Sequence, residues 1–356
     1  MADSKTQIFR SSPFSLVADH SSSACWAGRT QVLNQLKKLC RSWVNRSDST
    51  LDVVWANLGA GKTHALFHLR HLLETEFKTD PEAIVVYAEV PERDSHFIEI
   101  YRRLVSSLRL VDIAKLAVGA TKGSLSPSVA RACRAIEFGS ENEKRVATDW
   151  ITAGRPAMRE LRAVTGIDSR IESDVEAERV LSDLLGLAAA GGRRVVVLLD
   201  EFQRVGHLAQ RGREAMLSHL RTLYSRQSSH FSMVLAVGTR MEKTALELLP
   251  GELKTIMGMR PTVSLPEMSK DEAVEFVLRR LEWYRPEGYG GSAEAPFTRE
   301  QVEYVVAYLA DQGKARLTPR VLLQVFGIIY DEISVEGIPM GTQQLRDALD
   351  ALRWEE

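Results

Sequence analysis

The spacing of hydrophobic residues changes repeatedly between residues 30 and 265. Short runs of directly consecutive apolar residues, rich in β-branched side chains, predict strands that are buried on both faces. Stretches in which apolar residues recur every three or four positions predict helices that pack by one face. The consecutive runs predict strands over 51–56, 83–90, 194–199 and 232–237, and a last short strand over 262–265.

Helical spacing fills the intervals between these runs. The first helix is predicted to start at Thr30, whose hydroxyl suits an N-cap, and its apolar residues continue to Trp43. After Pro266 only helical spacing remains, and Gly288–Pro296 forms a glycine-rich loop within it. The predicted helices span 30–43, 65–73, 96–109, 127–137, 141–153, 156–163, 174–190, 211–226, 269–283, 298–311, 318–333 and 342–353.

This order of elements predicts an α/β protein with a doubly wound parallel sheet of five strands, followed by a small all-helical domain. Buried strands that alternate with helices form parallel sheets covered on both faces. We expect an N-terminal leader over 1–25, an α/β domain over 26–266 and a helical domain over 267–356. The interval of about 110–172 carries no strand pattern, so we interpret it as a helical insertion.

Composition excludes several classes of protein. Hydrophobic residues make up 44% and charged residues 26% of the 356 positions, which is ordinary for a globular protein. The formal net charge of −1 excludes a polycation that coats nucleic acid by bulk charge alone. Cys25, Cys40 and Cys133 form no closely spaced pair, which argues against a disulfide framework and a cysteine-rich zinc site. The chain has neither a long apolar segment nor an apolar signal core, so we expect a cytoplasmic protein with no membrane partner.

The turn after the first predicted strand carries a phosphate-binding pattern. ANLGAGKT matches GxxxxGK[ST] between a strand and a helix, except that Ala56 replaces the first glycine. We expect Gly59 to supply the backbone freedom instead. Backbone N–H groups of Ala60, Gly61 and the following helix would face the β-phosphate of ATP. Lys62 would bridge the β- and γ-phosphates, and the Thr63 hydroxyl would coordinate Mg²⁺.

A second acidic site follows the most apolar strand. RVVVLLDE ends in Asp200 and Glu201, and the carboxyl end of a buried strand in such a sheet lies beside the phosphate loop. Asp200 would hold Mg²⁺ through water, and Glu201 would polarise the attacking water. A small-molecule kinase with a phosphate loop has no need of the second acid. The pair therefore favours ATP hydrolysis with Mg²⁺ as cofactor.

Two further groups of side chains leave alternatives open. His64 and His68 are four residues apart on one helix and could hold a metal, but no carboxylate is placed as a third ligand. These histidines are better explained by packing of the helix face or as polar groups on the side of the phosphates. We place His64 among the residues expected to bind the nucleotide. The insertion is locally basic, which predicts either a solvated face or a contact with nucleic acid. The basic residues in question are Arg131, Arg134, Lys144, Arg145, Arg155, Arg159 and Arg162.

With both sites placed, the chain from about residue 26 to residue 335 resembles the AAA+ ATPases. The likeness is strongest to the branch that holds initiator-type ATPases, signal-transducing STAND ATPases and transposition-regulator ATPases. Ala27-Gly28-Arg29-Thr-Gln-Val-Leu is similar to the box that precedes the phosphate loop in this branch and lies over the adenine. The resemblance implies that Gly28 and Arg29 contact the nucleotide and that 267–356 is the family's helical lid.

The same resemblance assigns three more residues. SMVLAVGTR is similar to the sensor 1 strand, whose polar tip, here Thr239, helps to place the water or the γ-phosphate. LTPR is similar to the sensor 2 motif of the lid and would put Arg320 at the γ-phosphate. Gly258-Met259-Arg260 resembles the segment that carries an arginine finger, which acts on the nucleotide of a neighbouring subunit. Arg240 is the alternative finger.

The resemblance also implies partners and a setting. The interval between the phosphate loop and Asp200 is longer than is usual in the family, and its Trp150 and Gly154 resemble a helical insert in ATPases of BREX-type phage-defence operons. We expect a homo-oligomer that remodels or loads a partner on DNA in a phage-defence or mobile-element setting, with partner proteins from the same operon. The alternative is a STAND-like switch that assembles or signals with nucleotide and without nucleic acid.

Overall fold

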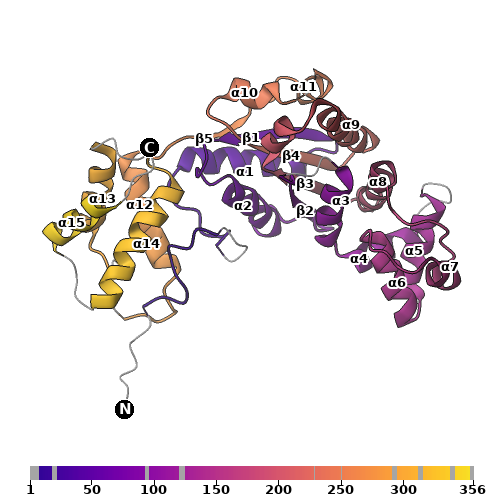
Figure 1. The fold of residues 1–356 in the computed structure, drawn as a ribbon, viewed down its shortest axis with the longest axis horizontal. Coiled ribbons are helices and arrows are strands. Elements are labelled where there is room, and N and C mark those ends of the chain that lie inside the picture. The colour runs from indigo at the N-terminus through magenta and orange to yellow at the C-terminus, as the bar shows by residue number, and fades with distance from the viewer. Residues whose placement is uncertain are drawn as a thin grey trace, which may run out of the picture. The chain divides into compact units, whose positions relative to one another are not determined.

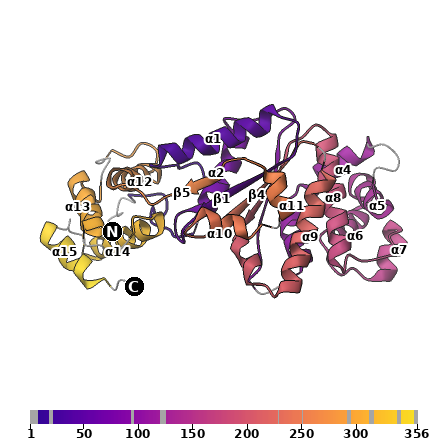
Figure 2. The same cartoon turned by 90° about the horizontal axis from the view of Figure 1, so that it is seen from above.

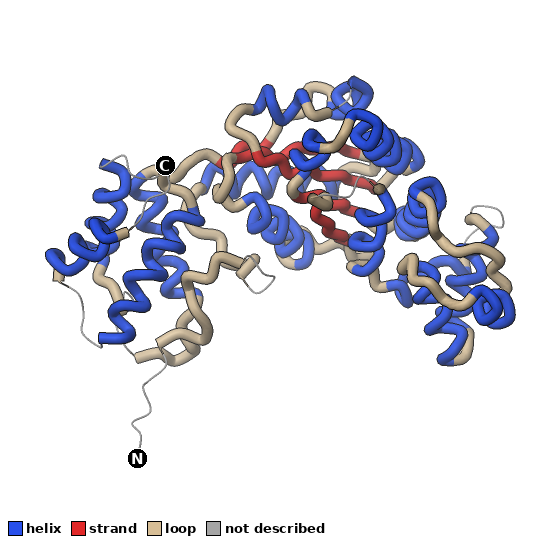
Figure 3. The backbone as a smooth tube through the Cα atoms, in the orientation of Figure 1, coloured by secondary structure: helices blue, strands red, loops and turns tan. Residues whose placement is uncertain are grey.

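The computed structural model describes residues 8–17, 22–92, 96–119, 125–227, 229–249, 251–290, 295–311, 316–336 and 341–352. Its strands form one five-stranded, all-parallel sheet in the order β2-β3-β4-β1-β5 (Figures 1 and 3). Val195 of β3 pairs with Ile84 of β2 and with Phe231 of β4. The predicted α/β class is therefore confirmed. The strands are β1 (Thr50–Ala56), β2 (Ile84–Glu89), β3 (Val195–Asp200), β4 (Phe231–Gly238) and β5 (Val263–Leu265).

The strands form at the runs of consecutive, mainly apolar residues. Every residue of β3 is buried, and β4 is buried from Phe231 to Val237. A strand of this kind gains free energy only when helices cover both of its faces. The helices are α1 (Thr30–Asn45), α2 (Lys62–Glu74), α3 (Phe97–Ser106), α4 (Leu110–Val118), α5 (Pro127–Phe138), α6 (Glu141–Ile151), α7 (Met158–Thr165), α8 (Asp174–Ala190), α9 (Gln210–Arg226), α10 (Glu242–Glu247), α11 (Gly251–Met257), α12 (Lys270–Trp283), α13 (Arg299–Asp311), α14 (Pro319–Glu336) and α15 (Thr342–Ala351), with a 3₁₀ turn η1 (Phe202–His207).

The chain divides into two compact units, each with its own apolar core. The first unit, here called the lid unit, joins 1–36, the loop and helix start at 56–71, and 264–356. The second, here called the sheet unit, joins 37–55 and 72–263. The phosphate loop thus belongs to the same compact unit as the C-terminal helices. The boundaries expected from the sequence, at residues 26 and 266, stay a prediction.

The described part of the leader completes the core of the lid unit. Phe9 and Phe14 are buried, and the ring of Phe14 stacks on Phe326 of α14 with 6.1 Å between ring centroids. The guanidinium of Arg280, on α12, donates from Nε to the carbonyl oxygen of Pro13 at 2.7 Å. Helix α12 begins at a capping box in which Ser269 and Glu272 exchange hydrogen bonds. The leader is held by the same helices that it helps to bury.

The predicted insertion folds as four helices of the sheet unit, α4 to α7, which pack on one another in sequence order (Figure 2). Trp150 is buried, and its indole Nε1 donates to the carbonyl oxygen of Ser169 at 2.7 Å. A capping box of Ser140 and Glu143 starts α6. No helix in the described residues combines the length and apolarity that a membrane span requires.

Several elements differ from the sequence expectation. Thr30 is the first residue of α1 instead of its cap, and Arg29 before it has a left-handed φ of 46°. The predicted helix over 96–109 ends at Ser106, and α4 follows at Leu110. Helices α10 and α11 and the turn η1 carry no prediction, since elements of six or seven residues are too short to show helical periodicity.

Candidate functional site

The phosphate loop joins β1 to α2 with the strand–turn–helix geometry that its sequence predicts. Gly59 and Gly61 have φ angles of 76° and 91°, a region that L-residues with side chains avoid. Ala56, by contrast, is the last residue of β1 and has strand backbone. The missing first glycine therefore causes no strain, because Gly59 and Gly61 make the turn. Lys62 begins α2, and only 5% of its surface is exposed.

The start of α14 lies directly against this loop, within the lid unit. The backbone N–H of Arg320 donates to the carbonyl oxygen of Gly59 at 3.3 Å. A Cβ at Gly59 would lie 3.0 Å from the Cβ of Arg320, so any side chain there would push the two segments apart. Pro319 lies 3.6 Å from the position of a Cβ on Gly61. The exposed side chain of Arg320 is thus anchored beside the phosphate loop.

Arg29 is a buried cation, and some of its N–H groups have no hydrogen-bond acceptor among the described residues. It is 3% exposed, and its Nη1 donates to the carbonyl oxygen of Ala60 in the phosphate loop at 2.6 Å. Its Nε and Nη2 have no hydrogen-bond partner among the described residues. Burial lowers the pKa of Arg29 to about 10, against the opposing charges of Glu272 and Glu267, so the group is charged at neutral pH. Buried N–H groups without acceptors are costly, and an anionic or oxygen-rich ligand would satisfy them.

The segment before Arg29 packs on the face of α2 that carries His64 and His68. The Nε2–H of His64 donates to the carbonyl oxygen of Ser22 at 3.1 Å, and the Nδ1–H of His68 donates to that of Ser23 at 2.7 Å. The ring of Trp26 lies 4.9 Å from the ring of His68, centroid to centroid. These imidazoles therefore hold the leader against α2, which is the packing role that the sequence favours.

Acidification is expected to weaken this packing. Burial is the main cause that lowers the pKa of His64 to about 4 from its ordinary 6.5. The neutral ring is bound in the folded state, so its stabilisation is complete above pH 6.5 and is lost as the pH falls toward 4. Between pH 7 and pH 5 we expect a loss of up to about 2 kcal/mol in the free energy of unfolding. Thermal unfolding of wild type and of His64→Gln, which cannot titrate, measures this; equal losses in both would contradict it.

The acidic group lies at the carboxyl ends of β3 and β2, in the sheet unit. Asp200 ends β3 and is fully buried. One carboxylate oxygen accepts from the backbone N–H of Glu201 at 2.8 Å, and the other accepts from the Tyr87 hydroxyl at 3.2 Å. Burial and the charges of Asp200 and Glu89 raise the pKa of Tyr87, which keeps the phenol protonated as a donor. These two hydrogen bonds fix the orientation of the Asp200 carboxyl group.

Glu201 and Thr239 are linked by a residue that the sequence reasoning missed. Glu201 adopts the left-handed region, with φ of 55°, which turns it away from the strand direction. Its Oε2 accepts from the amide Nε2 of Gln203 at 2.6 Å. The Oε1 of Gln203 in turn accepts from the N–H of Gly238 at 2.6 Å, and Thr239 is the next residue. The signal available in the sequence was an amide two residues after the acid pair.

The two candidate finger arginines differ in their surroundings. Arg260 is paired within its own chain, 3.7 Å from a carboxylate oxygen of Asp48 and 3.5 Å from one of Asp52. Asp52 is almost fully buried, so without Arg260 its carboxylate would lose its paired cation. Arg240 is exposed and makes no ion pair with the described residues. The geometry favours a structural role for Arg260 and leaves Arg240 free to meet another molecule.

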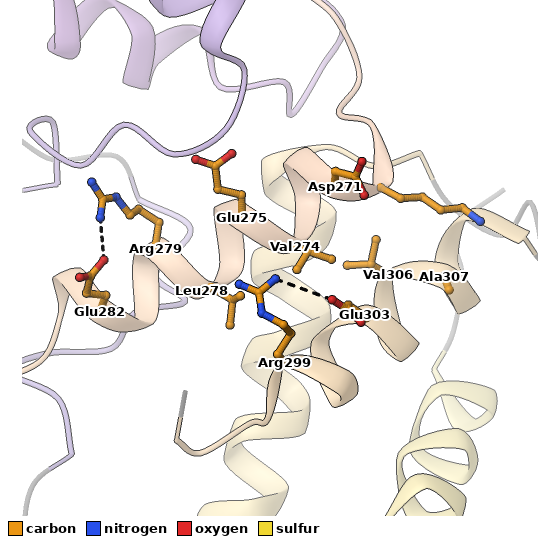
Figure 4. A pocket seen from close by; sticks show the side chains of 11 residues that line it. Asp271, Val274, Glu275, Leu278, Arg279, Glu282, Arg299, Glu303, Val306 and Ala307 are labelled. Atoms are coloured by element: carbon orange, nitrogen blue, oxygen red, sulfur yellow. Dashed lines mark hydrogen bonds and ion pairs between the residues drawn. The ribbon is translucent and has the colours of Figure 1, made fainter. Parts of the chain in front are cut away.

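A groove with a volume of about 780 Å³ runs between α12 and α13 of the lid unit (Figure 4). Its arginines are engaged by neighbouring acids, with Arg279 2.7 Å from Glu282 and Arg299 3.7 Å from Glu303. Asp271 and Glu275 add further negative charge. This lining does not suit a phosphate, so the groove is separate from the nucleotide chemistry.

Comparison with known proteins identifies the family. Residues 45–244, more than half of the chain, match the family model described as AAA domain, and the chain belongs to that family. Several solved structures share its fold. It resembles the ORC2 protein of Aeropyrum pernix in ADPNP–ADP complexes, at 13% identity over 97% of this chain and 72% of that one, with a TM-score of 0.59.

Two further solved structures share the fold. The ORC1 protein of Aeropyrum pernix in complex with DNA matches at 13% identity over 96% of this chain and 69% of that one, with a TM-score of 0.55. Cdc6p of Pyrobaculum aerophilum matches at 15% identity over 90% and 67% of the two chains, with a TM-score of 0.52. No curated protein matches the chain.

Proposed function

We propose that the chain binds ATP with Mg²⁺ and hydrolyses it. The observation that carries the proposal is the buried guanidinium of Arg29, which touches the phosphate loop and keeps two N–H groups without an acceptor among the described residues. Lys62 and Arg320 add two more cations around Gly59, Ala60 and Gly61. Three cations and a helix N-terminus around one glycine loop suit a polyphosphate.

Residues at or after the carboxyl ends of the strands would bind Mg²⁺ and the attacking water. The Thr63 hydroxyl would bind Mg²⁺ directly and the carboxylate of Asp200 would bind it through water; the ion would neutralise charge on the phosphates. Glu201 would accept a proton from the attacking water, and Thr239 would orient that water or the γ-phosphate. The phosphate loop follows β1, Asp200 ends β3 and Thr239 follows β4, and these three strands are neighbours in one parallel sheet. Ligands of such sheets bind at the carboxyl ends of the strands.

We further propose that hydrolysis takes place at the interface between copies of the chain. An arginine from one copy would stabilise the charge that develops on the γ-phosphoryl of the next, and Arg320 would act on the nucleotide of its own chain. Arg240 supports this role by its exposure, whereas the ion pairs of Arg260 with Asp48 and Asp52 would have to break first. Of the two arginines we therefore favour Arg240.

DNA is the partner that we propose for the oligomer. The ORC1 protein of Aeropyrum pernix, which shares the fold, was solved in complex with DNA, and this supports the class of partner but not its sequence. In the described part of the insertion, three arginines are exposed without an ion-pair partner, while Lys144 and Arg145 pair with acids. The exposed arginines are Arg134, Arg155 and Arg159. A phage-defence or mobile-element setting of the BREX type, with partner proteins from the same operon, stays part of the proposal.

The experiment that tests the function is ATP turnover by the purified chain, measured with and without duplex DNA. We expect hydrolysis that disappears with excess EDTA, rises when DNA is added and accompanies a larger species in size-exclusion chromatography with ATP. Arg134→Ala combined with Arg155→Ala and Arg159→Ala should remove the DNA effect and keep the basal rate. If DNA does not change the rate of hydrolysis and ATP still drives assembly, the result would support the STAND-like nucleotide switch instead. Absence of turnover and of ATP binding would refute the proposal.

A further inference from the structure

Gln203 makes a closer contact to the proposed base than its charged neighbour does. Its Nε2 lies 2.6 Å from Oε2 of Glu201, whereas Arg204 approaches the same oxygen only to 3.8 Å. Arg204 is engaged elsewhere, since it donates to the carbonyl oxygen of Val90 at 2.8 Å and lies 3.7 Å from Glu89. The orientation of the Glu201 carboxylate therefore depends on Gln203 first.

The other end of the same amide is tied to β4. Its Oε1 accepts from the backbone N–H of Gly238 at 2.6 Å. Gly238 ends β4, and its lack of a side chain makes room for the amide, because a Cβ there would lie 2.8 Å from Nε2 of Gln203. Close approach, and not a left-handed backbone, is thus what glycine provides at this position.

A primary amide is the side chain that fits between these two partners. The carboxylate needs a donor and the backbone N–H needs an acceptor, and an amide presents one of each side by side without a change of protonation. The two partners also fix which way the amide is turned, because the flipped amide would lose both hydrogen bonds. Buried Phe202 and Val205 on either side hold the turn η1 in place.

We propose that Gln203 is a positioning residue for hydrolysis, which couples the orientation of Glu201 to the end of β4 and so to Thr239. The inference rests on the proposed function. The amide holds Oε2 of Glu201, which leaves Oε1 to accept the proton of the water. When Thr239 contacts the γ-phosphate, the end of β4 would shift and move the amide of Gln203. The amide would in turn move the carboxylate of Glu201.

The decisive variant is Gln203→Glu, which has the same shape. It keeps an acceptor for the N–H of Gly238 but loses the donor to Glu201 and places two carboxylates together. We expect kcat for ATP to fall about 10-fold or more, while KM and the affinity for a fluorescent ATP analogue stay within about twofold. Gln210→Glu on exposed α9 is the matched control and should turn over as wild type.

A second variant changes the other partner of the Gln203 amide, Gly238. Gly238→Ala should displace the amide and lower kcat to a similar degree, and it should add no further loss when Gln203 is already Ala. In a Glu201→Gln background, Gln203→Glu should cost nothing more in single-turnover hydrolysis, because the residue acts through Glu201.

The outcomes separate the two proposals. If wild type hydrolyses ATP and Gln203→Glu hydrolyses it equally well, only the positioning role fails. An equal loss in the wild-type and Glu201→Gln backgrounds also overturns it, because that result indicates a structural effect. If wild type hydrolyses no ATP, the proposed function fails with it. Thermal unfolding of each variant shows whether a loss of rate reflects a loss of folded protein.

Discussion

Replacing Glu201 by glutamine is expected to leave ATP binding intact and to lower hydrolysis by about 10²-fold or more. The substitution keeps the size of the side chain and its capacity to accept a hydrogen bond from Gln203, but removes the basic carboxylate. Binding is retained because the cations around the phosphate loop are unchanged. Phosphate release under saturating ATP, with binding of a fluorescent analogue measured in parallel, provides the test.

Glu92→Gln is the matched control for this experiment. Glu92 lies 3.7 Å from Arg204, as part of the same charged group, but is exposed and makes no contact with Gln203 among the described residues. We expect it to turn over at the wild-type rate. A Glu201→Gln protein that hydrolyses ATP normally would assign activation of the water to another group.

Mixing two inactive proteins is expected to restore hydrolysis only when the missing arginine acts between chains. Lys62→Ala removes the buried cation of the phosphate loop and should abolish ATP binding. Arg240→Ala should bind ATP but lose about 10³-fold or more in rate, since a finger contributes about that much. In a mixed oligomer, the intact site of an Arg240→Ala chain can receive Arg240 from a Lys62→Ala chain, and activity should return.

Two companion mixtures make this test specific. Arg320→Ala mixed with Lys62→Ala should stay inactive, because Arg320 is anchored beside the phosphate loop of its own chain. Arg260→Ala should mainly lower the unfolding temperature, since it leaves buried Asp52 without its cation. Rescue of Arg260→Ala in place of Arg240→Ala would show that Arg260 is the finger. If no mixture recovers hydrolysis and the protein stays monomeric in the presence of ATP, the proposed site between chains is contradicted.

The parts of the fold that depend on local pattern could be predicted from the sequence. The consecutive apolar runs identified all five strands, because a strand covered on both faces is built mainly from apolar residues. The glycine, lysine and threonine of the phosphate loop could be placed because their chemistry requires a fixed spacing. Gly59 was expected to replace the glycine missing at Ala56, and its φ of 76° confirms this.

The remaining features depend on contacts between distant segments. Arg260, which follows α11, pairs with Asp48 before β1 and with Asp52 within β1; these segments are far apart in the chain, and no local pattern predicts the contact. The buried state of Arg29 likewise becomes visible only when the lid unit is assembled. Gln203 was overlooked because its importance lies in the N–H of Gly238, and a backbone group leaves no mark in a sequence.

The lid unit joins segments that lie before and after the sheet unit in the sequence, and this sets an order of events during synthesis. Phe14 is synthesised before the sheet unit, yet the rings that pack on it, Phe297 and Phe326, are synthesised after the sheet unit. The sheet unit can fold as soon as β4 and β5 have been synthesised, because its core contains none of these three phenylalanines. Until α14 has been made, the leader and the phosphate loop lack the helix that they contact, so the phosphate loop reaches its final contacts only after the sheet unit has been synthesised.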